Sequence, residues 1–474
     1  MSSVITRRRL PAPGTGGRDL AKARRAAFGH LIRCMPYLRC IAREHATALG
    51  GSHAAATDRT KKTMSEHMTA TPSNPGDAME ADVCIVGAGP VGATLACRLA
   101  VEGMRVVIID RAALPPMEHP AFDGRAYAIA AGSRRLLEAA GVWARLPMPA
   151  CDIREIRVTD GRPGQRPSPL FLEFGRDDAP EPFGSMIEAR ALRVALNASL
   201  HATPGITVLA PDEATVVRRP EGAVITTRSG RTISARLVVA AEGRRSPLRT
   251  QAGIVVTRLP YHQCGIVCAV AHERPHEGRA LEHFLPAGPF AQLPMAGTAE
   301  HPNLSALVWT DEEKLAHRLA ELPAEAFAHE IRRRMGDWLG EVTPVGRRWV
   351  YPLSAQYAQR YIDTRLVLVG DSAHGIHPIA GQGLNLGFRD VIALSDLLAG
   401  VHARGGDVGE ASVLRDYQAR CRPANMLMLA ATDMLERLFG NDNPVLRLAR
   451  DVGLAGVNRI TPLRRAFARH AMGL

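Results

Sequence analysis

The chain has 474 residues, of which 46% are hydrophobic and 22% charged, a composition that allows a large core and more than one domain. Its formal charge of +12 suggests a nucleic-acid-binding protein, but residues 1–79 hold 13 Lys/Arg and 5 Asp/Glu, which leaves the other 395 residues with +4. We therefore expect no nucleic-acid partner. No uncharged apolar run reaches 18 residues, so no membrane-spanning helix is expected either.

Residues 1–79 form a basic leader that we expect to be disordered and dispensable. The leader could be an organelle-targeting peptide, a disordered basic arm, or an extension upstream of a start at Met64, Met68 or Met79, and we favour an unstructured leader or such an extension. The chain's eight cysteines form no C-x-x-C pair, which indicates reduced thiols in a cytoplasmic protein. Cys264 and Cys268 near His262 could bind a metal, but we favour buried strand positions.

The stretch DVCIVGAGPVGATLACRLAVEGMRVVIIDR, residues 82–111, predicts a strand, a helix and a second strand with a G-x-G-x-x-G turn between the first two. Such a turn lets a dinucleotide pyrophosphate approach the backbone at a helix N-terminus, and Asp110 can accept the ribose hydroxyls. Asp110 disfavours a 2′-phosphate, so NADPH is not expected here, while NAD and FAD stay open. The predicted cofactor-binding residues of this stretch are Gly87, Ala88, Gly89, Pro90, Val91, Gly92, Asp110 and Arg111.

Two later apolar strands, within residues 235–249 and 364–375, also end in an acidic residue beside glycine. Ligands collect at the carboxyl ends of parallel strands, so three such ends would converge on one ligand. We expect Asp371 to be a buried carboxylate that a ligand satisfies. The intervening segments alternate like antiparallel hairpins, which predicts a second sheet over the cleft. His374 and His377 could bind a metal, but Pro378 and nearby glycines indicate irregular backbone, and no metal is expected.

Three motifs, GDSAHGIHPIAGQGLNLGFRDV, FDGRAYAIAAGSRRLLEAAGVW and HEGRALEHFLPAGPFAQLP, resemble class A flavoprotein monooxygenases and, more narrowly, the ubiquinone-biosynthesis aromatic hydroxylase family. The resemblance covers about residues 80 to 430. It implies an α/β fold in which a Rossmann-like FAD-binding domain of the GR2 type is interrupted by an antiparallel-sheet substrate domain and followed by C-terminal helices. The boundaries we expect are 80–155, 186–255 and 350–400 for the FAD-binding domain, 156–185 and 256–349 for the substrate domain, and 401–474 for the helices.

The resemblance also assigns roles. The Gly87–Gly92 turn would hold the FAD pyrophosphate and Asp110 the adenosine ribose, Asp371 would bind a ribityl hydroxyl, and the loop 379–385 would wrap the pyrimidine end of the flavin. Glu242 stands where the family has aspartate, which makes nicotinamide use less certain. The further cofactor-binding residues that the resemblance implies are Arg125, Arg190, Glu242, Gly243, Asp371, Gly381, Gly383, Leu384 and Asn385.

The activity implied is FAD-dependent, NAD(P)H-driven hydroxylation of a polyprenyl phenol intermediate of ubiquinone biosynthesis through a flavin C4a-hydroperoxide, with O2 and the prenylated phenol as partners and no metal. No catalytic residue is assigned. Candidate residues of the substrate pocket are Tyr261, Gln263, His283, Phe284 and Gln292. Two alternatives remain: another FAD oxidoreductase such as a prenyl reductase, and a non-catalytic flavin-binding subunit of a ubiquinone-biosynthesis complex.

The C-terminal stretch, residues 443–474, mixes apolar residues with six arginines. This pattern suits an interfacial helix at the inner membrane or a docking helix for other ubiquinone-biosynthesis proteins. An ordinary packing helix with a solvated basic face fits equally well. We expect a cytoplasmic protein for which peripheral membrane contact is an open alternative.

Overall fold

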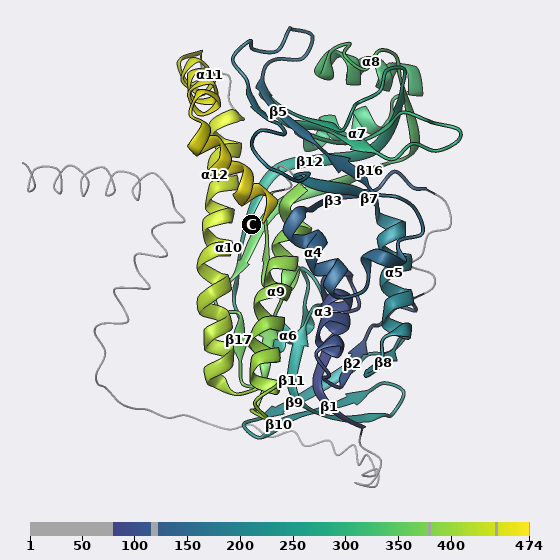
Figure 1. Cartoon of the computed structure of the whole chain (residues 1–474), viewed down its shortest axis with the longest axis vertical. Coiled ribbons are helices and arrows are strands. Elements are labelled where there is room, and N and C mark those ends of the chain that lie inside the picture. Colours follow the sequence, from purple (N-terminus) through teal and green to yellow (C-terminus); the bar gives the residue numbers. More distant parts are fainter. Residues whose placement is uncertain (1–78, 115–121, 378–380, 441–443, 474) are drawn as a thin grey trace, which may run out of the picture. The chain divides into compact units, whose positions relative to one another are not determined.

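The computed structural model describes residues 79–114, 122–377, 381–440 and 444–473 (Figure 1). These residues all belong to one compact unit of the chain. The predicted leader, with Cys34 and Cys40, lies outside the described residues apart from Met79. Ile379 of the predicted flavin loop also lies outside them.

The larger part of the first sheet is built from parallel, buried apolar strands. β1 (Met79–Val86) pairs with β11 (Thr232–Ala240) on one side and with β2 (Val106–Ile109) on the other. β18 (Leu366–Leu368) pairs with β11, and β8 (Ile206–Leu209) pairs with β2. β1, β11 and β18 are direct neighbours, so their carboxyl ends meet at one edge, as the sequence predicted.

Antiparallel additions extend this sheet. β17 (Ile362–Asp363) pairs with β18, and the hairpin of β9 (Ala214–Arg219) and β10 (Gly222–Thr227) pairs with β11. The sequence pattern placed this hairpin among the alternating segments but within residues 186–255 of the expected FAD-binding domain, and the structure joins it to the first sheet.

Helices pack against the parallel strands and against one another. α3 (Pro90–Val101) contacts β2, α5 (Ala189–Ala202) and α9 (Gln382–His402). Its residues from Gly92 to Ala100 are almost all buried, which explains why the segment is apolar on nearly every side. α9 in turn packs beside the long helix α10 (Ala411–Phe439) (Figure 1). The shorter helices are α4 (Ala131–Ala139), η3 (Trp143–Arg145), α6 (Pro247–Gln251) and η4 (Gly370–Ser372).

The second sheet has the strand order β19-β16-β12-β15-β14-β13-β5-β6. Its described strands pair antiparallel except for β13 and β5, which run parallel, a departure from the expected all-antiparallel sheet. A small third sheet has the order β3-β7-β4. The bounds are β19 (His374–Gly375), β16 (Val342–Ala358), β12 (Val256–His272), β15 (Leu304–Glu312), β14 (Gly288–Met295), β13 (Arg279–Leu285), β5 (Glu155–Asp160), β6 (Leu172–Phe174), β3 (Ala126–Ala130), β7 (Gly184–Glu188) and β4 (Cys151–Ile153).

The two faces of the second sheet are covered by different helices. α7 (Glu313–Glu321) and α8 (Ala324–Met335) share a hydrophobic core with one face, where the rings of Trp309 and Phe327 stack with centroids 5.8 Å apart. α11 (Pro444–Arg459) and α12 (Thr461–Met472), the last helices in the yellow part of Figure 1, contribute to the core on the other face.

The expected fold class is confirmed, and the domain boundaries stay a prediction. Among the described helices, none combines the length and hydropathy that crossing a bilayer requires. The six cysteines within the described ranges are free thiols, and five of them are buried, Cys264 and Cys268 in β12 among them.

Candidate functional site

The turn between β1 and α3 contains two glycines that close packing requires and one that faces open space. A Cβ on Gly92 would lie 2.0 Å from the Gly87 carbonyl oxygen, and one on Gly87 would lie 2.4 Å from the Ala241 oxygen. A Cβ on Gly89 would meet no protein atom within 4 Å. The turn is therefore tight towards the sheet and open on the side where a ligand could reach the backbone.

The N-terminus of α3 adds unpaired donors to this open side. Gly89 is the N-cap residue and Pro90 follows it, with no side chain capping the helix. Unpaired N–H groups and the helix dipole favour an anion at this position. At the end of β2, Asp110 accepts hydrogen bonds from the backbone N–H groups of Ala88 at 2.7 Å and Ala112 at 2.9 Å, which fixes its carboxylate beside the turn. Pro90 and Val91 open the helix, and Arg111 is exposed.

Glu242, the residue that departs from the family pattern, is engaged within the protein. Its Oε2 accepts hydrogen bonds from Ser246 Oγ at 2.5 Å and from the Leu248 N–H at 3.2 Å, at the start of α6. Burial raises the pKa of this carboxyl group, while the hydrogen bonds and the charges of Arg249 and Arg111 oppose that rise. The Gly243 N–H donates to Ser372 Oγ at 3.0 Å, which ties the β11 end to the β18 end.

The expectation that the Asp371 carboxylate is buried is wrong. Its side chain is 51% exposed and faces Arg244, whose Nε lies 3.5 Å from Oδ2. Asp371 lies in the single turn of η4, which follows β18 at the edge where β1, β11 and β18 end. The carboxylate is therefore at this edge but open to solvent, and ligand hydroxyls can reach it.

Arg125 directly precedes β3, Arg190 lies in the first turn of α5, and each pairs with a nearby carboxylate. Arg125 donates to Asp123 through Nε at 2.8 Å and Nη2 at 2.6 Å and stacks on Trp349, with Cζ 4.6 Å from the ring centroid. Arg190 Nε lies 2.5 Å from Glu188 Oε2. These pairs orient both guanidinium groups.

The start of α9 resembles the start of α3 in having an uncapped N-terminus. Gly381 is the N-cap residue with φ of 64°, and a Cβ on Gly383 would meet no protein atom within 4 Å. Asn385 is buried and bonds to the β3 backbone, accepting from the Ala130 N–H at 2.9 Å and donating to the Ala128 oxygen at 2.8 Å. Leu384, next to Asn385, packs against the core of the first sheet.

These features fit FAD. Two uncapped helix starts, each with a glycine whose missing side chain leaves open space, face the same sheet edge as two carboxylates that can accept hydroxyl hydrogens. A dinucleotide needs such phosphate donors and hydroxyl acceptors at separate points. Within the described ranges, no group of three metal-ligating side chains is found. His374 bonds to Asp390, and His377 is buried beside Tyr261 with ring centroids 4.9 Å apart.

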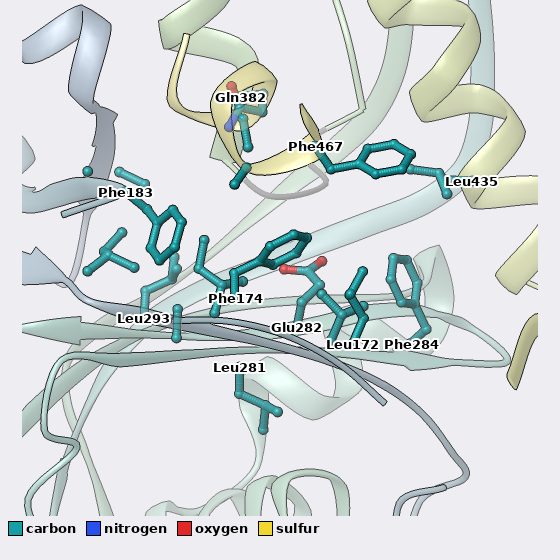
Figure 2. A pocket seen from close by; sticks show the side chains of 18 of the residues that line it. Leu172, Phe174, Phe183, Leu281, Glu282, Phe284, Leu293, Gln382, Leu435 and Phe467 are labelled. Carbon is teal, nitrogen blue, oxygen red and sulfur yellow. The ribbon is translucent and has the colours of Figure 1, made fainter. Parts of the chain in front are cut away.

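An apolar cavity of about 560 Å³ adjoins the start of α9. Gln382 and Asn385 line it at the α9 end, and Phe174 and Leu293 line it on the strands. Side chains of α10, α11 and α12, Phe439 among them, close the opposite side. Figure 2 labels two of them, Leu435 and Phe467. Its size and its mostly apolar lining suit an aromatic ring with an apolar substituent.

Of the five pocket residues proposed from the sequence, only Phe284 lines this cavity. His283 points to the other face of β13 and bonds to Thr159 at 2.6 Å. Gln292 bonds to Ser305, Gln263 to Glu436 and Tyr261 to Asp433.

Glu282, which the sequence reasoning did not single out, lines the cavity instead. The alternation of strand residues was the available signal, because Phe284 and Glu282 share a face of β13 and His283 does not.

Comparison with known proteins identifies the family. A family model described as FAD binding domain matches residues 80–432. Ubiquinone hydroxylase UbiL of Rhodospirillum rubrum is 50% identical over 394 residues, which cover 83% of this chain and 90% of that protein. The chain belongs to the ubiquinone hydroxylase family of FAD-binding proteins. A further family member, 3-demethoxyubiquinol 3-hydroxylase of Escherichia coli, is 33% identical over 83% of this chain and 98% of its own length.

Solved structures support the fold of this ubiquinone hydroxylase family member. PqsL of Pseudomonas aeruginosa, in complex with 2-aminobenzoylacetate, has a TM-score of 0.65 at 24% identity and covers 80% of this chain and 99% of its own. The p-nitrophenol 4-monooxygenase PnpA of Pseudomonas putida has a TM-score of 0.67 at 16% identity, covering 84% and 98%. The family assignment makes the protein a flavoprotein monooxygenase with FAD as its cofactor.

Proposed function

We propose that this protein hydroxylates the aromatic ring of a polyprenyl phenol in ubiquinone biosynthesis, with NAD(P)H as reductant and O2 as oxygen source. The observation that carries the proposal is the apolar cavity, which begins at Gln382 and Asn385 beside the FAD-compatible edge and extends between the strands and α10–α12. The names of UbiL and the Escherichia coli relative support the same ring chemistry. The cavity favours an apolar substituted ring over a small polar substrate.

The cofactor contacts that we propose follow the sheet edge. The Gly87–Gly92 turn and the start of α3 would bind the FAD pyrophosphate, Asp110 the adenosine ribose and Asp371 a ribityl hydroxyl. Gly381, Gly383 and the start of α9 would border the ring system, where the positive end of the helix dipole favours negative charge on the reduced cofactor. When bound, FAD supplies the redox chemistry with O2. Glu242 and Gly243 would support this edge through Ser246 and Ser372.

The remaining residues would hold the substrate and exclude water. Phe174, Phe183 and Leu293 offer apolar surface on the strand side, and Phe439 and Phe467 offer it on the helix side. A dry, apolar surrounding keeps water away from the reacting atoms, which limits side reactions with water, and holds the ring close to the cofactor.

The test is a reconstituted reaction with oxygen of known isotope. The FAD-loaded protein, NADH or NADPH, and a short-chain prenylated phenol are incubated under isotopically heavy O2, and the product is analysed by mass spectrometry. We expect one heavy oxygen atom in the ring product. NAD(P)H consumption without oxygen in the product would favour another FAD oxidoreductase, and no NAD(P)H consumption would favour a non-catalytic flavin-binding subunit.

We also propose peripheral contact with a membrane through the outer side of α10–α12. Large apolar residues are exposed there, including Leu427, Val452, Ile460 and Phe467. Phe467 and Leu435 both line the cavity and are exposed, so the apolar surface is continuous with the cavity lining. A prenylated substrate dissolved in lipid could enter the cavity from this side.

A further inference from the structure

A second cavity, of about 850 Å³, lies on the α8 side of the second sheet, and we call it the α8 cavity. On strands β5 and β13, it is lined by Arg157 and Arg279. Their neighbours Ile156 and Ala280 line the apolar cavity instead, because strand side chains alternate between faces. Leu281 marks the α8 side in Figure 2, where it points away from the other labelled side chains. The two cavities therefore lie on opposite faces of the sheet.

The α8 cavity has three walls. β5 and β13 form one, the loop of residues 161–171 forms the second, and α8 with residues 336–338 forms the third. The Gly164 N–H donates to the Arg333 carbonyl oxygen at 2.5 Å, which ties the loop to α8, and the Ser168 N–H donates to the Asp160 carbonyl oxygen at 2.9 Å, which ties it to the end of β5. The enclosed volume is within the range of about 300–1,000 Å³ that is typical of small-molecule sites.

The lining of the α8 cavity is basic on every wall. Among the described lining residues there is one carboxylate, that of Asp337, against five guanidinium groups. The lining arginines are Arg157 and Arg279 on the strands, Arg166 on the loop, and Arg332 and Arg333 on α8. A cleft lined by one sign of charge attracts small ions of the opposite sign, so an anion is the expected occupant.

Four of these guanidinium groups are held by carboxylates that lie outside the lining. The pairs are Arg157–Glu173, Arg279–Glu155, Arg332–Glu341 and Arg333–Glu330. Each guanidinium has five N–H donors, so a single carboxylate partner leaves several of them for a ligand. The fifth, Arg166, is exposed and forms no ion pair with any residue that the structure describes.

The lining also contains two buried donors that have no acceptor within the described part of the chain, Arg157 Nε and Trp338 Nε1. Neither group can accept a hydrogen bond, and a buried donor without an acceptor lowers stability. The Arg157 guanidinium lies over Phe171, with Cζ 5.0 Å from the ring centroid, and that of Arg279 lies over Trp338 at 5.9 Å. The walls thus offer oriented donors and few acceptors, so a matching ligand has to bring the acceptors.

We propose that the α8 cavity binds a soluble small molecule that carries phosphate groups, at a site separate from those of FAD and the ring substrate. The oxygens of a phosphate point in tetrahedral directions and can accept from the strand, loop and helix walls together, whereas the two oxygens of a carboxylate lie in one plane. The volume exceeds that of a single phosphate, which favours a molecule of nucleotide size or one with several phosphates.

A soluble ligand fits this position better than a lipid headgroup. The exposed apolar residues that we propose for membrane contact belong to α10–α12, and α11 and α12 pack on the other face of the second sheet. A membrane at those helices would lie across the sheet from the α8 cavity. The proposal does not depend on the proposed hydroxylation, because it takes only charge and shape from this cavity.

The test is calorimetric titration of the FAD-loaded protein, in which the FAD site is already filled, with pyrophosphate, ATP and citrate. The variant is Arg166→Gln with Arg333→Gln. It removes two charges from the lining and leaves Glu330 with a partner, because Arg334 also pairs with that carboxylate. The matched control is Arg228→Gln with Arg231→Gln, which removes the same charge from exposed positions between β10 and β11. FAD content is measured after each titration to show that ATP has not replaced the flavin.

We expect pyrophosphate and ATP to bind the unmodified protein, and citrate to bind at least about tenfold more weakly. The variant in the lining should bind pyrophosphate at least about tenfold more weakly than the unmodified protein, since it loses two charge-assisted contacts. The control should keep the affinity of the unmodified protein. Hydroxylation should be equal in variant and control, because neither pair of arginines lines the apolar cavity.

Equal pyrophosphate affinity in the variant and the control would overturn the inference and would assign the binding to other cations, such as those of the basic leader. Absence of pyrophosphate and ATP binding to the unmodified protein would overturn it as well. Citrate binding as tight as that of pyrophosphate would contradict the choice of phosphate. Weaker sedimentation of the lining variant than of the control with phosphatidic acid vesicles would contradict a soluble ligand and indicate a lipid headgroup.

Discussion

The imidazole Nε2 of His374 lies 2.6 Å from the Oδ2 atom of Asp390, and both side chains are buried. The same Oδ2 accepts the Gly370 N–H at 2.9 Å, and Oδ1 accepts from Asn425 Nδ2 at 2.9 Å. Burial alone would lower the pKa of His374, but the Asp390 carboxylate raises it above the usual histidine value. One carboxylate on α9 thus joins the end of β18, the start of β19 and α10.

Replacing Asp390 should therefore disturb both folding and the cofactor edge. Asp390→Ala leaves three buried donors without this acceptor, and we expect a loss of about 3–5 kcal/mol in the free energy of unfolding. FAD retention should fall as well, because Gly370 precedes Asp371 in η4. Urea unfolding and the flavin absorbance of the purified protein measure the two effects.

The matched control is Asp396→Ala, which removes an exposed carboxylate from the same helix. It should change stability by less than about 0.5 kcal/mol. Equal stabilities for the two variants would mean that the Asp390 contacts contribute little to the fold.

The two glycines of the first turn should respond in opposite ways to an added methyl group. Gly92→Ala places a Cβ 2.0 Å from a backbone oxygen, so the protein without FAD should lose roughly 1–3 kcal/mol of stability. Gly89 has φ of −62° and open space around an added Cβ, so Gly89→Ala should leave that stability unchanged or slightly higher.

The same Gly89→Ala variant should bind FAD at least about tenfold more weakly, since the methyl group would occupy the space proposed for the pyrophosphate. Thermal unfolding of the FAD-free protein and titration with FAD separate the two effects. Unchanged FAD affinity would exclude the pyrophosphate from this turn.

The parts of the site that the sequence predicted are those determined by local geometry. Gly92 is required by its close contact with the Gly87 backbone within one strand-turn-helix unit, and Asp110 follows its strand directly. Gly87 belongs to the same local motif, although its own close contact is with Ala241 just after β11. The convergence of three strand ends also followed from the rule for parallel sheets, although the strands are more than a hundred residues apart.

The sequence could not show where individual side chains point once distant elements meet. The exposure of Asp371 depends on the single turn of η4, and the contacts of Glu242 depend on α6, which begins five residues later. Glu282 and His283 are adjacent in sequence, yet only the strand register and the helices on each face determine which of them lines the cavity. These outcomes follow from tertiary packing, which no local pattern contains.

His377 should make the protein sensitive to acid. Its side chain is fully buried, and burial lowers its pKa from 6.5 to about 4. The unfolded chain then binds a proton that the folded chain does not, so stability is retained above about pH 6.5 and is lost as the pH falls towards 4. The loss amounts to roughly 3 kcal/mol for this residue.

His377→Gln should flatten the fall in the free energy of unfolding between these pH values, as measured by urea titrations. The slope should persist in part, because burial also lowers the pKa of His283 to about 4. His317→Gln, at an exposed position of α7, serves as the control and should follow the unmodified protein. An identical slope in the His377 variant would show that its protonation is not linked to folding.

Membrane contact should depend on the exposed apolar residues of α11 and α12 and on the arginines beside them. Arg450 and Arg464 point inward to Asp160 and Asp178, which leaves Arg459, Arg465 and Arg469 exposed to meet anionic lipid. Changing Val452, Ile460 and Phe467 together to Ser removes three exposed apolar side chains without touching these cations.

The triple variant should bind anionic phospholipid vesicles at least about tenfold more weakly in co-sedimentation, since each lost apolar side chain contributes on the order of 1 kcal/mol. The matched control is Val217→Ser with Val224→Ser, which removes exposed apolar residues from the β9–β10 hairpin. The measurements use the full chain. Because its basic leader is also expected to attract anionic lipid, the result rests on the difference in vesicle binding between the variants. Equal vesicle binding by the triple variant and the control would mean that α11 and α12 do not contact the membrane and that any binding comes from the leader.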